Sequence, residues 1–338
     1  MTITDRLRSA SHLHDWIDEL TRLGPPPQPF RMPSRREAAA LLPRLAVPDE
    51  DAAEILSTLP APDTDADLWW LLERSYHRLT AGLGDDEDFR HSEDGRGAWG
   101  RWPPLPDTFG SAGRLFYPHL FLAAVPAIRQ WHAALGIDPD VSWATLQQLG
   151  RSISLHRDMY GVIGLEFPEW NVLPFRGGLF QLGRLQFRRG TSFWNHDETI
   201  AAGAPFAAGA RVLDLHIPPT GPLTPAAVDD SFHAARRFFG HHFPGDDSPW
   251  AVCASWLLDP QLAEYLPADS NIIQFQRRFH LSPEWEHDGN AAVIKFVFRR
   301  VDASLDELPQ RTTLQRAILT HIRAGRTWKT RRGWCPIA

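Results

Sequence analysis

The sequence is poor in cysteine, in lysine and in long apolar stretches, and the shortages of cysteine and of apolar stretches each argue against a class of protein. Cys253 and Cys335 are the only cysteines in 338 residues, which argues against a disulfide scaffold and favours a reducing compartment. No run approaches the ~18 apolar residues of a membrane span, and no secretion signal is evident at the start. Lys295 and Lys329 are the only lysines. We therefore expect a cytoplasmic protein without a membrane partner.

Length and charge describe an ordinary soluble protein with room for two domains. A net charge of −6 with 22% charged residues gives no reason to expect a nucleic-acid partner. A chain of 338 residues fits one large or two ordinary domains. The periodicity changes near residues 160–168. We expect a helical domain over residues 1–160 and a sheet-containing domain over residues 161–338.

Helical patterns dominate the first half. Ser34 and Glu37 form a capping box for a short helix, and another helix is expected from Pro48 to about Leu59. Residues 68–79 carry apolar side chains at helical spacing. Two further helices are expected over 116–135 and 142–156, the first shortened or kinked by its prolines. The acidic, Gly- and Pro-rich span 84–110 is typical of a long loop.

The most informative segment runs from Arg211 to Ser231. Val212–Ile217 reads as a buried strand, which breaks at the sequence PPTGPL. Thr224 then stands where a helix N-cap belongs, and Pro225 at the first helical position, where its missing N–H costs nothing. A strand that turns into a helix N-terminus leaves N–H groups and a positive dipole end at one spot, which suits a phosphate or pyrophosphate. An ordinary strand–loop–helix connection remains the alternative.

The remaining segments of the second half alternate between strand and helix patterns. The patterns predict strands at 249–258, 271–281 and 292–300, a short helix at 260–266, and two strands within 170–190 that turn at either Arg176-Gly177-Gly178 or Gly183. This order predicts a mixed sheet of six or seven strands with flanking helices. It resembles the core of the GNAT-type N-acyltransferases, which bind acyl-coenzyme A with the pyrophosphate on the helix after the fourth strand.

The resemblance narrows on the phrases LGRLQFRR, LDLHIPPTGPL, CASWLLDPQLAEYLP and SNIIQFQRRF. They are similar to a two-part, actinobacterial-type family that joins a helical N-acyltransferase N-terminal domain to a GNAT-like C-terminal domain. The resemblance implies an α+β fold, an acyltransferase activity, acyl-CoA as co-substrate and no metal. The chain departs from the superfamily in one respect. The usual loop, Gln/Arg-x-x-Gly-x-Gly/Ala, is replaced by PPTGPL with a single glycine, so fewer amides can face a pyrophosphate.

The resemblance also assigns roles to residues. The donor site is expected at the loop and the helix start: Ile217, Thr220, Gly221, Leu223, Thr224 and Pro225. His216 is the candidate general base, because a histidine pKa near 6.5 suits deprotonation of an ammonium or hydroxyl at neutral pH. Asp214 shares its strand face and is a candidate partner in the acceptor site. A strand-end histidine bonded to a neighbouring carbonyl is the alternative for His216.

Tyr265 is the candidate acid, because many superfamily members hold a tyrosine at this place that protonates the departing thiolate. Trp256 is expected in the wall of the acceptor pocket. Gln274 and Gln276 fall on one face of the strand predicted at 271–281 and are candidates for holding an amide or hydroxyl of the acceptor. An exposed sheet face is the alternative for both glutamines, and a small-core packing role is the alternative for Tyr265.

Other reactive groups suggest rival functions. Cys253 lies in an apolar strand, where a buried thiol is inert. His156, Asp158 and His196 would be the ligands of a non-haem metal enzyme, although the first two are expected at a helix end and the third in a loop. The single-glycine loop is also compatible with a GNAT-like binding protein without turnover. The basic tail 323–332 is expected to be a solvated face, or to meet the 3′-phosphate of coenzyme A. A direct acyl transfer to an amine or hydroxyl of a small molecule is the favoured function.

Overall fold

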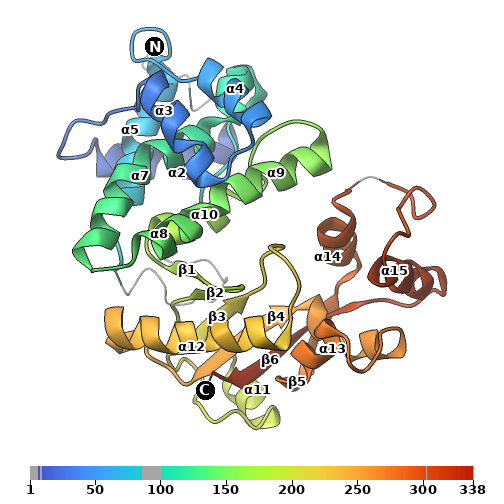
Figure 1. Cartoon of the computed structure of the whole chain (residues 1–338). Helices are drawn as coiled ribbons and strands as arrows, with labels where there is room; N and C mark the ends of the chain where they lie inside the picture. Colours follow the sequence, from blue (N-terminus) through green and yellow to red (C-terminus); the bar gives the residue numbers. More distant parts are fainter. Residues whose placement is uncertain (1–6, 8–9, 86–100, 302, 338) are drawn as a thin grey trace. The chain divides into compact units, whose positions relative to one another are not determined.

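The computed structural model describes residue 7 and residues 10–85, 101–301 and 303–337, apart from the side chains of residues 284 and 285. Within these ranges the chain forms two compact units that divide between Phe180 and Gln181 (Figure 1). The first unit is helical, and the second is built on a mixed sheet with flanking helices. The expected α+β class is confirmed.

The helical unit contains the helices that the sequence predicts and several shorter ones. Their bounds are α2 His14–Leu23, α3 Arg35–Leu41, α4 Asp49–Ser57, α5 Ala66–Thr80, α6 Gly110–Arg114, α7 Phe116–Ala134, α8 Pro139–Leu146, α9 Gln148–Tyr160 and α10 Pro168–Phe175. The capping box before α3 is formed, because the Ser34 hydroxyl accepts from the Glu37 N–H and the Glu37 carboxylate accepts from the Ser34 N–H. The segment expected over 142–156 is two helices, α8 and α9, which meet at Gln147.

Helix α7 is the centre of this unit. It runs through Pro126 without ending, and its buried residues include Phe116, Leu120 and Phe121. Helices α5 and α10 both pack against it. The Phe121 ring lies 4.9 Å from that of Phe175 in α10. Truncating one such buried ring to alanine typically costs ~3–5 kcal/mol, so α7 anchors the unit's stability.

The region just before the sheet is helical where a strand was expected. Residues 168–175 form α10, so the predicted strand at the start of 170–190 is wrong there. Buried Arg176 follows the helix and donates to the carbonyls of Arg78 and Leu79 at 2.7 and 3.0 Å, which caps the C-terminal end of α5. Gly177 has φ 77°, and a Cβ there would lie 2.4 Å from the Trp131 ring. These contacts extend the helical unit beyond Tyr160. Most of the loop expected over 84–110 lies outside the described residues.

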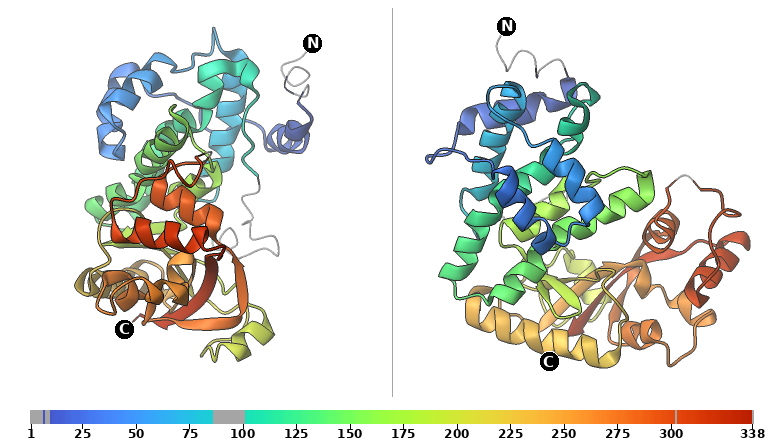
Figure 2. Two further views of the ribbon diagram at one scale, coloured as in Figure 1. Left: turned by 90° about the vertical axis from the view of Figure 1, so that its right-hand side faces the viewer. Right: turned by 45° about the horizontal axis from the view of Figure 1, so that its top comes forward.

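The second unit contains one six-stranded sheet, in the order β1-β2-β3-β4-β6-β5. Its strands are β1 Leu179–Leu182, β2 Leu185–Arg188, β3 Leu213–His216, β4 Trp250–Ser255, β5 His280–Asp288 and β6 Lys329–Pro336. The hairpin β1–β2 turns at Gly183 (φ 72°), which settles the two alternatives for that turn. Strands β3 and β4 are parallel, whereas the pairs β2–β3, β4–β6 and β5–β6 are antiparallel. Figure 2 shows the long β5–β6 pair in orange and dark red.

Helix α12 (Pro225–His242) covers one face of this sheet (Figure 1). Its buried residues Val228, Phe232 and Phe239 face apolar positions of the strands, and the Phe232 ring lies 6.2 Å from the ring of Phe187 in β2. The opposite face carries α11 (His196–Ala201) and a cluster of four buried residues, Trp194, Val212, Val252 and Trp334. Val212 and Val252 point to this second face, because successive side chains along a strand point alternately to the two faces of the sheet.

Two predicted strands in the C-terminal part are wrong. Residues 271–276 form α13 (Asn271–Gln276), which begins at Ser270, whose hydroxyl accepts from the Ile273 N–H. Residues 292–298 belong to α14 (Asn290–Val293) and a π-helical turn (Ile294–Phe298), and the Asp288 carboxylate accepts from the Asn290 N–H at their start. Both segments pack with α15 (Thr313–Arg323) in one apolar cluster. Short helical turns also occur at 244–246, 256–258 and 260–264. No helix in the described residues is long and apolar enough to cross a membrane.

Candidate active site

The two parallel strands at the centre of the sheet separate after a short common stretch. The register joins β3 to β4 only at Leu213↔Ala251 and Asp214↔Val252. Beyond that point His216 stays paired with Gln186 of β2, while Ser255 stays paired with Arg331 of β6. Beyond that point the facing edges of β3 and β4 are therefore not joined by a β-ladder. The backbone N–H and C=O groups along such edges need other hydrogen-bond partners. An open edge of this kind can accept an extended ligand or polarise a carbonyl.

Asp214 and His216 lie together where β3 leaves β4. The Asp214 Oδ2 atom lies 3.3 Å from the His216 Nε2 atom. The Asp214 side chain is 9% exposed and that of His216 is 23% exposed, so the carboxylate is enclosed and the imidazole reaches solvent. A buried carboxylate next to a histidine orients the ring. The pair thus has the geometry of a base with an orienting partner.

Arg188 joins this pair from the neighbouring strand. It lies opposite Asp214 in the β2–β3 register, and its Nη1 atom is 3.9 Å from the Asp214 carboxylate. Burial lowers the pKa of Arg188, and the Asp214 carboxylate raises it. Gln186 lies opposite His216 on the same face. The sequence reasoning did not single out Arg188 or Gln186, although the alternation of polar and apolar residues in LQFR was a signal for both.

A second ion pair lies on the same face of the sheet. Arg332 is opposite Ala254 in the β4–β6 register, and its Nη1 atom donates to the Glu198 carboxylate at 3.0 Å. Its guanidinium also lies 4.6 Å from the centre of the Phe193 ring. Burial lowers the pKa of Arg332, while Glu198 and then Asp214 raise it. The face opposite α12 is therefore charged beside the open strand edges.

The loop between β3 and α12 ends at the helix start that the sequence predicts. The Thr224 hydroxyl accepts from the Ala227 N–H, and Pro225 occupies the first turn, so the expected N-cap is confirmed. Gly221 has φ 135°, a conformation that glycine adopts with little strain. The other expected donor-site residues differ in exposure: Thr220 is exposed, Ile217, Thr224 and Pro225 are half-buried, and Leu223 is buried.

Tyr265 is held by a different set of residues. It follows the turn 260–264, and its hydroxyl lies 3.0 Å from Nδ1 of His321. Its ring packs against Trp328, in the same cluster as the buried Trp256. Burial lowers the pKa of His321, which favours the neutral imidazole. The phenol thus has a proton-sharing partner that the sequence reasoning did not identify.

The two glutamines lie on a helix, so the shared strand face predicted for them is wrong. The Gln276 amide donates to the carbonyls of Leu257 and Asp259 at 2.7 and 2.8 Å. The Gln274 amide donates to the carbonyl of Asp269 at 2.6 Å. These bonds secure the turns before α13. The side-chain amide N–H groups that were expected to bind the acyl acceptor therefore donate to backbone carbonyls of the protein.

Cys253 is buried on the α12 side of β4, and burial raises the pKa of its thiol well above the usual value. The thiol is therefore protonated at neutral pH and unsuited to attack. The basic residues of the tail are paired with carboxylates: Arg323 with Asp306, Arg326 with Glu264, Lys329 and Arg331 with Glu286, and Arg332 with Glu198.

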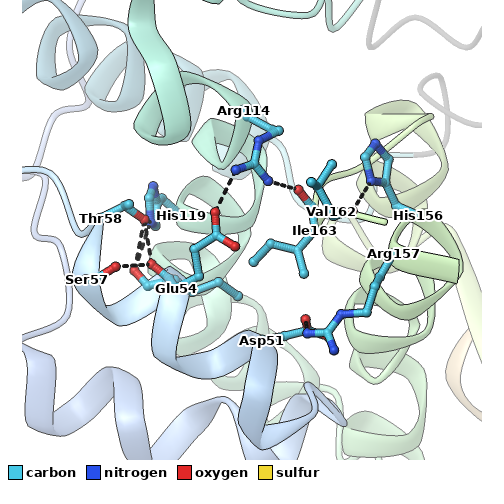
Figure 3. A network of polar contacts seen from close by, with 11 residues as sticks. Asp51, Glu54, Ser57, Thr58, Arg114, His119, His156, Arg157, Val162 and Ile163 are labelled. Carbon is cyan, nitrogen blue, oxygen red and sulfur yellow. Dashed lines mark hydrogen bonds and ion pairs between the residues drawn. The ribbon is translucent and has the colours of Figure 1, made fainter. Parts of the chain in front are cut away.

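The residues named for a metal site are engaged otherwise. The His156 Nδ1–H donates to the Val162 carbonyl at 2.8 Å, in a polar network of the helical unit (Figure 3). Arg157 of α9 contacts Asp51 of α4 in the same network. His196 opens α11 in the other unit. Within the described ranges, no three His, Cys, Asp or Glu side chains are grouped so that they could hold a metal ion.

Comparisons with known proteins agree with this architecture. The family description of the N-acyltransferase N-terminal domain matches residues 36–177, and that of the GNAT-like C-terminal domain matches residues 179–335. None of the curated proteins matches the sequence. Several solved structures do, and each covers 99% of this chain and 98% of its own.

The matching structures are complexes with CoA or an acyl-CoA, and three of them differ in their ligands. One is an acyltransferase in complex with decanoyl-CoA, at 42% identity and a TM-score of 0.88. Another is an acyltransferase mutant in complex with octanoyl-CoA, at 41% identity and a TM-score of 0.87. The third is an acyltransferase in complex with decanoyl-CoA and teicoplanin, at 42% identity and a TM-score of 0.86.

Proposed function

As a member of the acyltransferase family that joins an N-acyltransferase N-terminal domain to a GNAT-like C-terminal domain, this chain is an enzyme with acyl-CoA as co-substrate, and we propose that it acylates an amine or hydroxyl of a small molecule by direct transfer. The observation that carries the proposal is the separation of β3 from β4 beyond Asp214 and Val252. The open edges offer a place for the thioester, with the start of α12 beyond the end of β3 for the phosphates.

In this mechanism the acceptor nitrogen or oxygen attacks the thioester carbonyl between β3 and β4. A backbone N–H at the open edge stabilises the negative charge that develops on the carbonyl oxygen. His216 takes the proton of the acceptor, directly or through water, and Asp214 stabilises the resulting imidazolium from 3.3 Å. The new bond to carbon forms as the carbon–sulfur bond breaks.

Tyr265 donates a proton to the departing thiolate in this proposal. Its hydroxyl already shares a hydrogen bond with His321 Nδ1, which positions the phenol, and the phenolate regains its proton from water after transfer. Cys253 takes no part, because its buried, protonated thiol is a poor nucleophile. The acyl group therefore passes from sulfur to acceptor without an acyl-enzyme.

We propose a medium-chain donor and an acceptor of the teicoplanin type. The support is the set of related structures, whose ligands are octanoyl-CoA, decanoyl-CoA and teicoplanin. These proteins share 41–42% of their residues with this chain over nearly its whole length. The acceptor chemistry, amine or hydroxyl, is to be read from the product.

The test combines donor binding with product analysis. Acyl-CoAs from short to long chain are added to the protein, and the melting temperature and the thiol released in the presence of teicoplanin are measured. At a donor concentration 100 times Kd, stabilisation should be about 2.7 kcal/mol. Mass spectrometry of the acceptor should show one added acyl group, and that of the protein none. Absence of any thermal shift at millimolar donor across all chain lengths, or a shift without thiol release, rejects the proposal.

A further inference from the structure

The loop before α12 is poor in the N–H groups that a phosphate site needs. Four of the eight residues from Pro218 to Pro225 are prolines, which have no N–H. The Thr220 N–H is taken by the Pro218 carbonyl at 2.8 Å. Fewer backbone N–H groups can therefore face a pyrophosphate at this loop, which favours additional hydrogen-bond donors from another part of the chain.

Arg184, at the tip of the β1–β2 hairpin, lies against this loop. Its Nε–H donates to the carbonyls of Gly221 and Pro222 at 3.0 and 3.3 Å, and its Nη1 donates to the Pro218 carbonyl at 2.7 Å. The hairpin tip is fixed as well, because the Arg184 backbone N–H donates to the Ser231 hydroxyl of α12 at 2.8 Å. The guanidinium is thereby held across the loop that precedes the helix.

The charge of Arg184 is not balanced by an acidic side chain. Its side-chain partners in the described part of the protein are carbonyl oxygens, and no carboxylate contacts it there. Burial lowers the pKa of Arg184, the direction expected for a half-buried cation without a counter-charge. By contrast, Arg278, which also reaches the first turn of α12, is neutralised by Asp229 at 2.5 Å.

The Arg184 guanidinium also has N–H groups that do not contact the loop. A guanidinium has five N–H groups, and the contacts to the loop engage only Nε–H and one N–H of Nη1. The Nη2 group and the second N–H of Nη1 remain for a ligand. Their planar arrangement matches two oxygens of a phosphate.

We propose that Arg184 binds the pyrophosphate of the acyl-CoA donor, supplying the donors that the proline-rich loop lacks. The inference rests on the proposed donor site at this loop, and it adds a residue outside the loop to that site. The same side chain shapes the loop through its carbonyl contacts and neutralises the phosphates. This explains how a loop with one glycine serves a donor that carries several negative charges.

The experiment compares two donors that differ only beyond the pantetheine. Calorimetry measures the Kd of decanoyl-CoA and of S-decanoyl-pantetheine, which carries no phosphate, for wild type, Arg184→Gln and Arg184→Lys. We expect Arg184→Gln to weaken decanoyl-CoA binding by at least about tenfold, as for loss of a charge-assisted contact, and to leave the pantetheine thioester unchanged. Arg184→Lys should fall between, because it keeps the charge and loses the fork.

Arg236→Gln is the matched control. Arg236 lies on the same helix, further from its start, and is paired with Asp247 at 2.6 Å; its loss should leave both Kd values unchanged. Equal weakening of both donors by Arg184→Gln would assign Arg184 a purely structural role and overturn the proposal, as would an unchanged Kd for decanoyl-CoA. If Arg184→Gln does not fold, the two Kd values of Arg184→Lys decide in the same way. Failure of the proposed function appears separately, as wild-type protein that binds the donor and releases no thiol.

Discussion

The carboxylate of Asp214 lies 3.3 Å from the imidazole of His216, at the point where β3 leaves β4. We predict that His216→Ala lowers kcat by roughly 10²–10⁴-fold, the usual effect of losing one proton-transfer group. The Kd of acyl-CoA should change little, because the imidazole acts on the acceptor. Thiol release under saturating donor and acceptor measures kcat. His241→Ala, at the exposed end of α12, serves as the control; a His216→Ala enzyme of undiminished kcat would remove His216 from the mechanism.

The proximity of Asp214 and His216 could be predicted from the sequence, because the period of a strand is two and the strand was correctly identified. The strand–helix junction at Thr224 and Pro225 was predictable for the same kind of reason, since caps and first-turn prolines act locally. Arg188 could not be placed in this way. Its position beside Asp214 depends on which residues of β2 and β3 face each other, and that register is a property of the folded sheet.

The segments at 271–281 and 292–300 show the limit of periodicity. Short runs in which apolar residues alternate fit a strand or a helical turn, and tertiary packing decides between them. Here both pack against α15 and Trp328 in an apolar cluster, so helical turns bury Ile273 and Val293. The local signal for a helix was Ser270. Its hydroxyl caps α13 by accepting from the N–H of Ile273, three residues further along the chain. Gln274 and Gln276 were misplaced with the strand.

Gly221 provides a test of the donor loop. Its φ of 135° is a conformation that other residues rarely adopt, and a Cβ there would meet no atom within 4 Å. Gly221→Ala therefore acts through backbone strain alone, of order 1–3 kcal/mol, which the loop relieves by moving. We predict a several-fold rise in the KM of acyl-CoA with little change in kcat. Gly245→Ala, where φ is ordinary and space is also open, is the control. Equal KM values for wild type and Gly221→Ala would show that the loop conformation does not matter for the donor.

Two buried histidines predict how stability depends on pH. Burial lowers the pKa of His119 to about 4 and that of His132 to about 3, whereas an unfolded histidine titrates near ~6.5. Since the unfolded chain then binds protons that the folded chain does not, their contribution is full above about pH 6.5 and is lost as the pH falls. Together they should remove roughly 2.7 kcal/mol per pH unit between about pH 6 and pH 4.

Urea unfolding at about pH 7 and about pH 5 measures this loss. In His119→Gln the amide can replace Nε2 as donor to the Ile55 carbonyl, which His119 contacts at 3.2 Å, and the variant no longer titrates. Its loss of stability between the two pH values should be smaller than that of wild type by roughly 1–2 kcal/mol. His12→Gln, at an exposed site, should behave as wild type. Parallel curves for wild type and His119→Gln would show that His119 is not the group that titrates.

The ion pair between Arg157 and Asp51 leads to the strongest prediction for the stability of the helical unit. Asp51 has no exposed surface, and its carboxylate contacts the Arg157 guanidinium, which is 27% exposed (Figure 3). Removing the cation in Arg157→Met leaves a buried carboxylate unpaired, which typically costs ~3–5 kcal/mol. The double variant Asp51→Leu/Arg157→Met should recover most of this loss, because apolar residues replace a buried ion pair at little net cost. Arg31→Ala removes an ion pair with Glu37 that is exposed on both sides and should change the free energy of unfolding far less than Arg157→Met. Urea unfolding followed by circular dichroism gives all the values; a double variant no more stable than Arg157→Met would show that the penalty comes from lost packing and not from the isolated charge of Asp51.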